Sequence, residues 1–342
     1  MTLPIPVDYA AMEAKLVSEL PAGKQWQYEP KWDGFRCLAF KDSDDVALRS
    51  KAGQPLERYF PEIVEAIAAL RVEQCVLDGE LVVPQGDGLS FDELLMRIHP
   101  AASRVTKLSR EHPALYVVFD LLVDDRGGLL IAKALTERRV ALEHFFTRHL
   151  KNAPRFRLSR VTTSRADVDA WFASLGSGLD GVVAKRVDLP YQSGERKGMQ
   201  KFKHMRTADC VVGGFRYGTK TEVVGSLLLG LFDDGGLLHH VGFSSNIAAS
   251  ERASVTRKLE ALRGGEGFTG RAPGGPSRWS SERSGEWVPL KTKLVVEVQY
   301  DHFSGDRFRH GTKFLRWRPD KAPAQCTLAQ VQQESVATLA LL

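Results

Sequence analysis

The sequence predicts an α+β protein of two domains, residues 1–207 and residues 208–342. Up to about residue 207, apolar runs of strand length alternate with segments whose apolar residues recur at helical spacing. From Ala208 and Asp209 onward, helix signals become rare and short strands follow one another, separated by turn residues. A chain of 342 residues has room for two ordinary domains, so we place the boundary at this change of pattern.

The first domain is expected to mix helices with strands. Apolar periodicity predicts helices over residues 9–20, 62–70, 90–97, 136–150 and 165–175, and Ser90 with Glu93 forms a capping-box pattern at the start of the third. Strands are expected over residues 26–40, 46–48, 75–83, 115–123, 179–186 and 199–204. Within residues 26–40, Asp33-Gly34 between two apolar runs predicts the tight turn of a hairpin. Lys31 would then lie at a strand end.

The second domain is expected to be a small closed β-structure. Strands are predicted over residues 210–217, 226–232, 237–243 and 293–303, with turn residues between them. One helix is expected over residues 248–262 and a C-terminal helix over residues 328–342. Residues 263–285 are rich in Gly, Ser and Arg, which predicts a mobile loop.

Composition narrows the class of protein. The 47 Lys and Arg residues against 42 Asp and Glu give a net charge of +5, which permits a polyanionic partner without establishing one. The four cysteines, Cys37, Cys75, Cys210 and Cys326, form no Cys-x-x-Cys pair. We expect free thiols in a reducing compartment and no structural zinc. With no signal-peptide pattern and no apolar stretch long enough to cross a bilayer, a cytoplasmic protein without membrane contact is expected.

Charged residues cluster at four predicted strand ends of the first domain. The clusters are Lys31/Asp33/Arg36, Asp78/Glu80, Asp180/Lys185 and Lys201/Lys203. Any one of them fits a structural explanation, a salt bridge or a sheet rim, as well as it fits a functional site. Together they indicate a polar cleft, because charges inside apolar strands are costly unless paired or functional. Its Lys and Arg residues suit phosphates, and its carboxylates suit Mg²⁺.

Seven motifs follow one another along the chain. They are Lys31-Trp32-Asp33-Gly34, Arg49-Ser50-Lys51, Asp78-Gly79-Glu80, Tyr116-Val117-Val118-Phe119-Asp120, Asp180-Gly181-Val182-Val183-Ala184-Lys185, Lys201-Phe202-Lys203 and Arg316-Trp317-Arg318-Pro319-Asp320-Lys321. In this order they resemble the motifs of the covalent nucleotidyltransferases, and within them the ATP-dependent DNA ligases of the small bacterial ligase C type and the ligase domain of ligase D. The resemblance implies a nucleotidyltransferase domain of ATP-grasp-like antiparallel sheets with helices, followed by an OB-fold β-barrel domain.

The resemblance also implies roles for individual residues. Lys31 would be the nucleophile that becomes lysyl-AMP. The nucleoside would be held by Glu29 at the adenine edge, Arg36 and Glu80 at the ribose, and Phe119 stacked on the base, although Phe119 in so apolar a strand also fits a plain core position. The phosphates would be bound by Lys201, Lys203, Arg196 and, from the second domain, Arg318 and Lys321. A divalent metal, Mg²⁺ or Mn²⁺, would be bound by Asp180 and Glu80.

Two positions depart from the family pattern. Asp180 stands where the family usually has Glu, and its shorter side chain implies a metal contact that is shifted or water-mediated. Lys51 stands where the family usually has Arg, and a Lys cannot make a planar bidentate contact. The role of Lys51 toward the nucleotide or the nick phosphate is therefore open, and Arg49 could compensate.

The resemblance implies an ATP-dependent DNA ligase that seals nicked duplex DNA in repair, as a monomer, with DNA-repair proteins as partners. A free Lys has a pKa of about 10.4, and we expect Lys201, Lys203 and the metal to lower the pKa of Lys31. Phosphate contacts with DNA are expected from basic positions in both domains: Arg186, Arg196, Lys197, Arg206, Arg216, Lys220, Arg307, Arg309 and Lys313. The alternatives are an RNA ligase, an RNA-capping nucleotidyltransferase, and a non-catalytic OB-type nucleic-acid binder.

Overall fold

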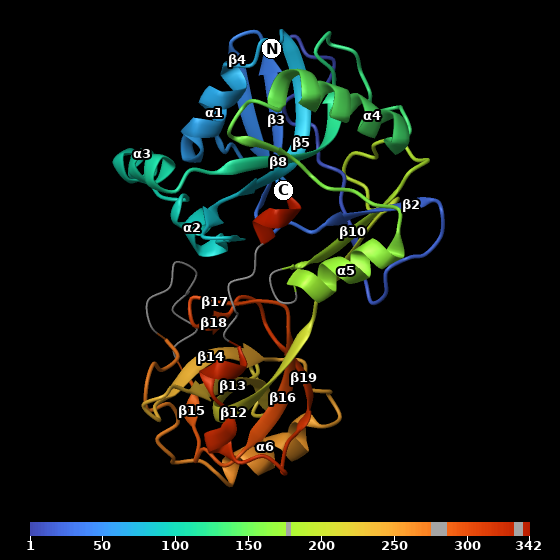
Figure 1. The fold of residues 1–342 in the computed structure, drawn as a ribbon. Helices are drawn as coiled ribbons and strands as arrows, with labels where there is room; N and C mark the ends of the chain where they lie inside the picture. Colours follow the sequence, from blue (N-terminus) through green and yellow to red (C-terminus); the bar gives the residue numbers. More distant parts are fainter. Residues whose placement is uncertain (176–178, 275–285, 332–337) are drawn as a thin grey trace. The chain divides into compact units, whose positions relative to one another are not determined.

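The computed structural model describes residues 1–175, 179–274, 286–331 and 338–342, which form two compact units (Figure 1). The first unit comprises Met1–His204 with the C-terminal Gln333–Leu342, and the second comprises Met205–Gln332. The second unit thus begins slightly before the expected residue 208. The chain end belongs to the first unit, because Leu341 is buried among Trp32 and Val117 and the Leu339 N–H donates to the Asp87 carbonyl over 3.0 Å. Placing the C-terminus in the second domain was wrong.

The larger sheet of the first unit has five strands in the order β4-β3-β5-β8-β9. Their bounds are β3 (Phe35–Asp42), β4 (Asp45–Ser50), β5 (Gln74–Val82), β8 (Leu115–Val123) and β9 (Phe156–Leu158), antiparallel except for the parallel pair β8 and β9. α1 (Pro61–Ala68) and α4 (Leu135–Phe145) contribute to the hydrophobic core on one face of this sheet. α1 provides Ile63 and Ile67, and α4 provides Leu142. Every residue of β8 is buried, as its continuous apolar run predicts.

The smaller sheet of the first unit has four strands in the order β1-β11-β10-β2. They are β1 (Lys15–Val17), β2 (Trp26–Pro30), β10 (Gly181–Arg186) and β11 (Met199–Lys203). α5 (Arg165–Leu175) packs on this sheet through Val168 and Trp171. The predicted hairpin over residues 26–40 is wrong, because β2 pairs with β10 whereas β3 pairs with β4 and β5. Lys31 to Gly34 instead connect the two sheets.

Other elements of the first unit follow or correct the sequence predictions. The helix predicted over residues 9–20 is wrong: this segment is irregular apart from β1, and Ala11 and Met12 are buried. α2 (Phe91–Met96) begins after Ser90, whose hydroxyl accepts the Glu93 N–H over 3.2 Å. α3 (Ala102–Glu111) was not predicted, and the helix expected over residues 136–150 is α4 followed by a π-helical turn, Phe146–Leu150. The short hairpin β6 (Pro84–Gln85) and β7 (Gly88–Leu89) completes the unit.

The second unit is a closed β-barrel of the OB type. Its strands run in the order β14-β13-β12-β16-β19, and a parallel bridge between Ser244 and Thr312 joins the two edges. Their bounds are β12 (Arg206–Tyr217), β13 (Val224–Phe232), β14 (Leu238–Ser244), β16 (Val295–Tyr300) and β19 (Lys313–Trp317). β15 (Val288–Pro289) pairs with β12, β17 (Phe303–Ser304) with β18 (Arg307–Phe308), and α6 (Arg252–Glu260) packs on β13.

Two predictions for the second unit are only partly covered by the structure. Of the loop expected over residues 263–285, residues 275–285 lie outside the described residues. The C-terminal helix is wrong where the chain is described, since Leu328–Gln330 and Thr338–Leu341 are short 3₁₀ turns, and residues 332–337 lie outside the described part. Among the described residues, no helix is long and apolar enough to cross a membrane.

Candidate active site

A pocket of about 140 Å³ lies in the first unit, where segments of its two sheets come together. Seven of the sequence-predicted site residues line it: Glu29, Lys31, Arg36, Lys51, Glu80, Phe119 and Lys201. They come from chain segments as far apart as β2 and β11, so the fold gathers most of the charged strand ends around one cavity. Asp180, Arg196 and Lys203 belong to the same unit but do not line this pocket.

Lys31 is positioned by the backbone that links the two sheets. It directly follows β2, as the sequence predicts for a residue at a strand end, and its N–H donates to the Gly181 carbonyl over 2.9 Å. Trp32 is 5% exposed, and its indole N–H donates to the Ser159 hydroxyl over 3.0 Å. A Cβ added at Gly34 would lie 2.1 Å from the Leu81 carbonyl oxygen, so only glycine fits there. The lysine is thus held by a rigid segment.

The Lys31 ammonium is surrounded by carboxylates. Its Nζ donates to Asp180, which is 5% exposed. Burial is the largest single influence on the Lys31 pKa and lowers it, but Asp180, Asp33 and Glu80 together outweigh burial and raise the pKa above its ordinary value. The lysines alone therefore do not give the lowering of the Lys31 pKa that was expected from Lys201, Lys203 and a metal together. The pKa of Lys201 is the one that falls, chiefly through burial and then through Lys31 and Lys203.

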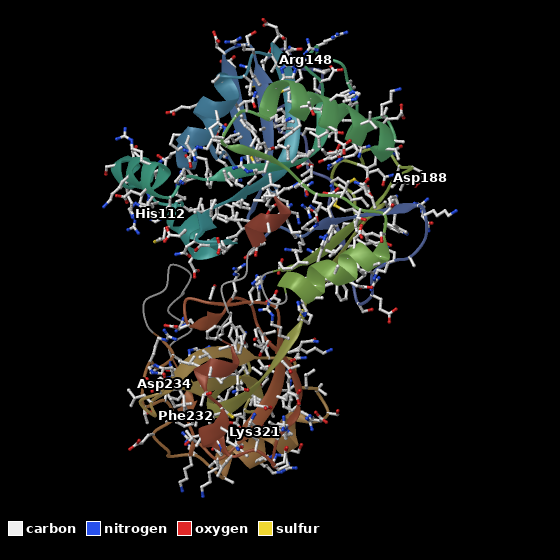
Figure 2. All side chains as sticks on the ribbon, viewed as in Figure 1. His112, Arg148, Asp188, Phe232, Asp234 and Lys321 are labelled. Carbon is white, nitrogen blue, oxygen red and sulfur yellow. The ribbon has the colours of Figure 1, made fainter. Side chains whose placement is uncertain are left out.

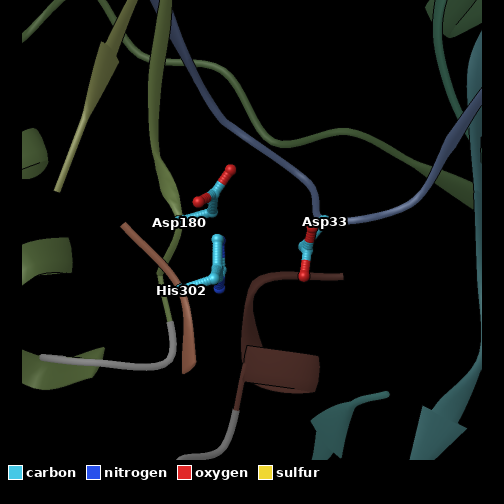
Figure 3. Close-up of side chains that lie close together, drawn as sticks. All are labelled: Asp33, Asp180 and His302. Carbon is cyan, nitrogen blue, oxygen red and sulfur yellow. The ribbon is translucent and has the colours of Figure 1, made fainter. Parts of the chain in front are cut away.

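Asp33 and Asp180 are the paired carboxylates of this site (Figure 3). One carboxylate oxygen of each lies within 4.8 Å of the other, a separation that one divalent cation can bridge. Glu80, which the sequence paired with Asp180 as a metal ligand, does not lie within that distance of both among the described residues. Asp33 was noticed only as part of a charged cluster. Its position directly after Lys31-Trp32 in a connecting segment was the signal that it shares the site.

Arg36 is held by a buried carboxylate that the sequence reading left without a role. Its Nε and Nη2 donate to the two oxygens of Asp78, each over 2.6 Å, and the Asp78 side chain is fully buried. The Tyr191 hydroxyl donates to Asp78 over 2.7 Å. Burial lowers the Arg36 pKa most, yet Asp78 overrides it and the net shift is upward. Asp78 inside an otherwise apolar run, two residues before Glu80, was the available signal.

Glu80 lines the same pocket, and its carboxyl group is partly protonated at neutral pH. Burial raises its pKa to about 7, against the opposing influence of Arg36 and Lys31. Glu80 stands opposite Arg36 in the β3–β5 pairing, which places the two side chains on one face of the larger sheet. A carboxyl in this condition can both accept and donate a hydrogen bond at neutral pH.

Phe119 lines the pocket because the sheet bulges at this residue. Asp78 pairs with Asp120 and Gly79 with Val118, so Phe119 is an extra residue in β8. The Arg36 guanidinium carbon and the Lys185 Nζ each lie 4.4 Å from the centroid of its ring. Of the two readings of Phe119, a pocket wall or plain core, the structure therefore favours the pocket wall. Only a three-dimensional register could have revealed the bulge.

Glu29 is bound to a lysine for which the sequence suggested no function. Lys185 forms a 2.8 Å ion pair with Glu29, and the two side chains are about 5% exposed or less. The Gln27 amide donates to the same carboxylate over 3.0 Å. Lys185 belonged to a charged cluster, and its pairing follows from β2 running antiparallel to β10.

Lys51 and Arg196 share one acidic partner, Glu13. The Glu13 carboxylate lies 3.0 Å from the Lys51 Nζ and 3.1 Å from the Arg196 Nε. Its hydrogen bond with Lys51 is the main cause that lowers the Glu13 pKa. Glu13 lies in the segment that the sequence predicted to be helical, so this interaction was hidden by a wrong secondary-structure prediction.

In the second unit, the two motif residues Arg318 and Lys321 converge on Asp209. Nη1 of Arg318 donates to Asp209 over 2.8 Å, and the Lys321 Nζ does so over 2.7 Å. Arg318 also bonds Asp320, and that hydrogen bond is the main cause that raises the Arg318 pKa. Lys321 is labelled in Figure 2. Asp209 is a partner that the sequence reading used only as a domain-boundary signal.

A mixed α+β unit with a lysine in a charged pocket, joined to an OB-type barrel, is the architecture of the nucleotidyltransferase class that the motifs suggested. Residues 10–203 match the family described as "ATP dependent DNA ligase domain", and residues 220–321 match "ATP dependent DNA ligase C terminal region". The chain belongs to the ATP-dependent DNA ligase family, which confirms the resemblance read from the motifs.

Individual relatives agree with this assignment. DNA ligase C2 of Mycolicibacterium smegmatis is 41% identical over 350 residues, covering 97% of this chain and 96% of the relative. The multifunctional non-homologous end joining DNA repair protein LigD of Mycobacterium tuberculosis is 30% identical over 304 residues, which cover 88% of this chain and 37% of LigD. A solved structure of a Lig E DNA ligase shares the fold, with a TM-score of 0.56 and 17% identity over 90% of this chain and 99% of that one.

Proposed function

We propose that the chain is an ATP-dependent DNA ligase that seals nicks in duplex DNA, through an AMP carried first by Lys31 and then by the DNA. The observation that carries this proposal is the position of Lys31, held by the backbone in a pocket that both cations and carboxylates line. In the first step the Lys31 Nζ attacks the α-phosphorus of ATP. The N–P bond forms as the bond to the pyrophosphate oxygen breaks.

The side chains around Lys31 divide between nucleoside and phosphates. Phe119 lies at the pocket wall, where it would stack on the adenine with Glu29 at the edge of the base. Arg36 and Glu80 lie on one face of β3 and β5 and suit the ribose. Lys201 lines the pocket, and Lys203 follows two residues later on the same strand face, so both suit the α-phosphate. Lys51 and Arg196 would exchange Glu13 for phosphate oxygens.

Before it attacks, Lys31 must lose a proton, and its partner Asp180 governs that step. In the structure Asp180 stabilises the ammonium form. The Asp33 and Asp180 oxygens, with Glu80 at the pocket, are the hard ligands that Mg²⁺ or Mn²⁺ prefers. A divalent cation there would supply positive charge that favours the neutral amine and stabilises phosphate charge. Engagement of Asp180 by such a charge would release Lys31 as a nucleophile.

The later steps transfer the AMP and join the strand. The 5′-phosphate at the nick attacks the Lys31-linked phosphorus, which frees the Nζ and leaves AMP on the DNA. The 3′-hydroxyl then attacks the 5′-phosphorus, and AMP departs. Arg318 and Lys321 would orient the pyrophosphate of the first step, exchanging their bonds to Asp209 for phosphate oxygens.

The setting of the reaction is part of the same proposal. We place the enzyme in the cytoplasm, acting as a monomer in DNA repair alongside other repair proteins. The four cysteines are free and buried, as expected in a reducing compartment. DNA as the polyanionic substrate accords with the net charge of +5.

A sealing assay tests the proposal. A nicked duplex, with each strand made as DNA or RNA, is incubated with the full chain and with ATP or GTP, in Mg²⁺ or Mn²⁺. We expect joined DNA with ATP and little with GTP. Joining only of RNA strands would establish the RNA-ligase alternative, and labelling of the protein by GTP but not ATP would establish the capping alternative. No covalent nucleotide and no joining would leave the nucleic-acid binder.

A further inference from the structure

A buried tyrosine behind the pocket binds the carboxylate that holds Arg36. Tyr191 lies between β10 and β11 and is 5% exposed. Its hydroxyl donates to Oδ2 of Asp78 over 2.7 Å, and the same oxygen accepts a hydrogen bond from Nη2 of Arg36 over 2.6 Å. The Asp78 side chain is fully buried, and hydrogen bonds are stronger there than in water. The three side chains form one line of hydrogen bonds that ends at the pocket.

The same hydroxyl also anchors the pocket wall formed by Met12, Glu13 and Ala14. It accepts the Met12 N–H over 2.9 Å, and this bond is buried. The hydroxyl therefore uses its one hydrogen to hold Asp78 and a lone pair to hold Met12. Two parts of the site that are far apart in the chain, Met12 and Arg36, are linked through this single oxygen atom.

The Tyr191 ring is fixed by its surroundings. The Arg138 guanidinium carbon lies 5.6 Å from the centroid of the ring, and the Tyr9 ring stacks on it with the centroids 6.2 Å apart. Arg138 is itself held by two hydrogen bonds to Asp120, over 2.8 and 3.0 Å. A donor held by packing in this way fixes the orientation of the carboxylate that accepts from it, here Asp78.

The orientation of Asp78 in turn decides how Arg36 is aimed. Arg36 stands opposite Glu80 in the strand pairing, whereas its guanidinium reaches to Asp78, two residues before Glu80. The guanidinium carbon lies 4.4 Å from the centroid of the Phe119 ring. Because the guanidinium is a rigid planar fork and Asp78 engages its Nε and Nη2, the angle of the Asp78 carboxylate sets the direction in which Nη1 donates.

We propose that Tyr191 is a positioning residue that sets the preference of the pocket for ATP over 2′-deoxyATP. This role rests on the proposed function, in which Arg36 and Glu80 bind the ribose. Through Asp78, the Tyr191 hydroxyl holds Arg36 at one orientation toward the sugar. A hydrogen bond weakens steeply with its angle, so a small turn of the guanidinium loses a bond to a ribose hydroxyl. Without the Tyr191 hydroxyl, the pocket still binds the triphosphate but distinguishes the two sugars less.

Nucleotide binding to the full chain tests this proposal without AMP transfer. ATP and 2′-deoxyATP are used as α,β-methylene analogues with Mg²⁺, in which carbon replaces the oxygen whose bond to the α-phosphorus would break. Isothermal titration calorimetry gives the two dissociation constants, and their ratio is the sugar preference. Tyr191→Phe keeps the ring and removes only the hydroxyl. It should lower the preference by about three- to tenfold, which is what one hydrogen bond contributes, through weaker binding of the ribose analogue.

Tyr28→Phe is the matched control, because it removes a hydrogen bond of the same length in the same unit. Tyr28 is 2% exposed, and its hydroxyl donates to the Pro21 carbonyl over 2.7 Å. Thermal unfolding compares the stability lost by the two variants. If the Tyr191 hydroxyl acts on the sugar and not only on stability, the sugar preference falls in Tyr191→Phe and stays at the parent value in Tyr28→Phe.

The kinetics of AMP transfer from ATP give a second readout. The half-saturating ATP concentration should rise in Tyr191→Phe by the same factor as the dissociation constant, while the maximal rate changes by less than about twofold, because a ribose contact is made equally before and during the transfer. A parent without sugar preference, an unchanged preference in Tyr191→Phe, or equal losses in Tyr28→Phe would overturn the proposal. A parent that transfers no AMP to Lys31 would refute the proposed function, while the binding ratios still decide the role of Tyr191.

Discussion

Burial decides how much an arginine–carboxylate pair contributes in this protein, and two pairs of matching geometry allow a test. Arg36 donates through Nε and Nη2 to Asp78, each over 2.6 Å, and Arg186 does the same to Asp188 over 2.8 and 2.7 Å. The Asp78 side chain is fully buried, whereas that of Asp188, labelled in Figure 2, is 51% exposed. The substitutions Asp78→Asn and Asp188→Asn therefore change the same chemistry in different surroundings.

Asp78→Asn should cost about 3–5 kcal/mol of unfolding free energy, because it leaves the Arg36 charge without its buried partner. It also weakens the acceptor of the Tyr191 hydroxyl, which adds to the loss. Asp188→Asn should produce no resolvable change, since solvent screens the exposed pair. In addition, Arg36 would no longer be held over Phe119, so ATP affinity should fall in Asp78→Asn alone.

Hydrogen exchange followed by mass spectrometry suits this test, because peptides from β5 and β8 report on the first unit without interference from the second. The intact protein is titrated with urea, and the exchange of these peptides at each urea concentration gives the unfolding free energy of the first unit for each variant. Equal losses in Asp78→Asn and Asp188→Asn, or a fully stable Asp78→Asn protein, would refute the reasoning that burial controls these pairs.

Three further predictions concern the pH response, a glycine and a helix cap. Since His240 has a pKa of about 3 when folded and about 6.5 when unfolded, the unfolded chain binds the proton first, and the unfolding free energy should drop by about 1.4 kcal/mol between pH 7.5 and 5.5. Thermal unfolding should show this drop to be smaller in His240→Phe. Gly34→Ala should lower the unfolding free energy of the first unit by about 1–3 kcal/mol and slow AMP transfer to the protein, because the new Cβ meets the Leu81 carbonyl. Unchanged hydrogen exchange together with an unchanged rate of AMP labelling would contradict this. Ser90→Ala removes the acceptor of the Glu93 N–H, so the opening free energy of α2, measured by hydrogen exchange, should fall by about 1 kcal/mol. Ser90→Thr keeps a hydroxyl acceptor and should retain most of this stability.

Local patterns predicted the elements that depend on local interactions. α5 has the bounds that its apolar periodicity indicated, and β8 has those of its continuous apolar run. The Ser90 cap follows from hydrogen bonding within one turn. The hairpin over residues 26–40 failed because strand pairing is not local. β2 finds its partner in β10, and an Asp-Gly turn signal cannot show that two neighbouring strands belong to different sheets.

The site was predictable as a set of charged positions but not as a network. The motifs identified most of the residues that line the pocket, including Lys31, Glu80 and Lys201. Their partners could not be read in the same way, because Asp78 and Glu13 act through register and loop packing. The raising of the Lys31 pKa by Asp180, Asp33 and Glu80 was missed for the same reason: the sequence shows charges, whereas their distances decide the sign of the shift.

The most direct test of the central claim is to locate the covalent nucleotide. The full chain is incubated with α-labelled ATP and a divalent cation, without DNA, and the labelled peptide is sequenced by mass spectrometry. Lys31→Arg, which keeps the charge, serves as the test variant, and Lys15→Arg, at an exposed lysine of β1, is the matched control. The account predicts AMP on Lys31 in the parent and in Lys15→Arg, and none in Lys31→Arg. Label retained by Lys31→Arg, or found on Lys185 or Lys201 in the parent, would contradict it.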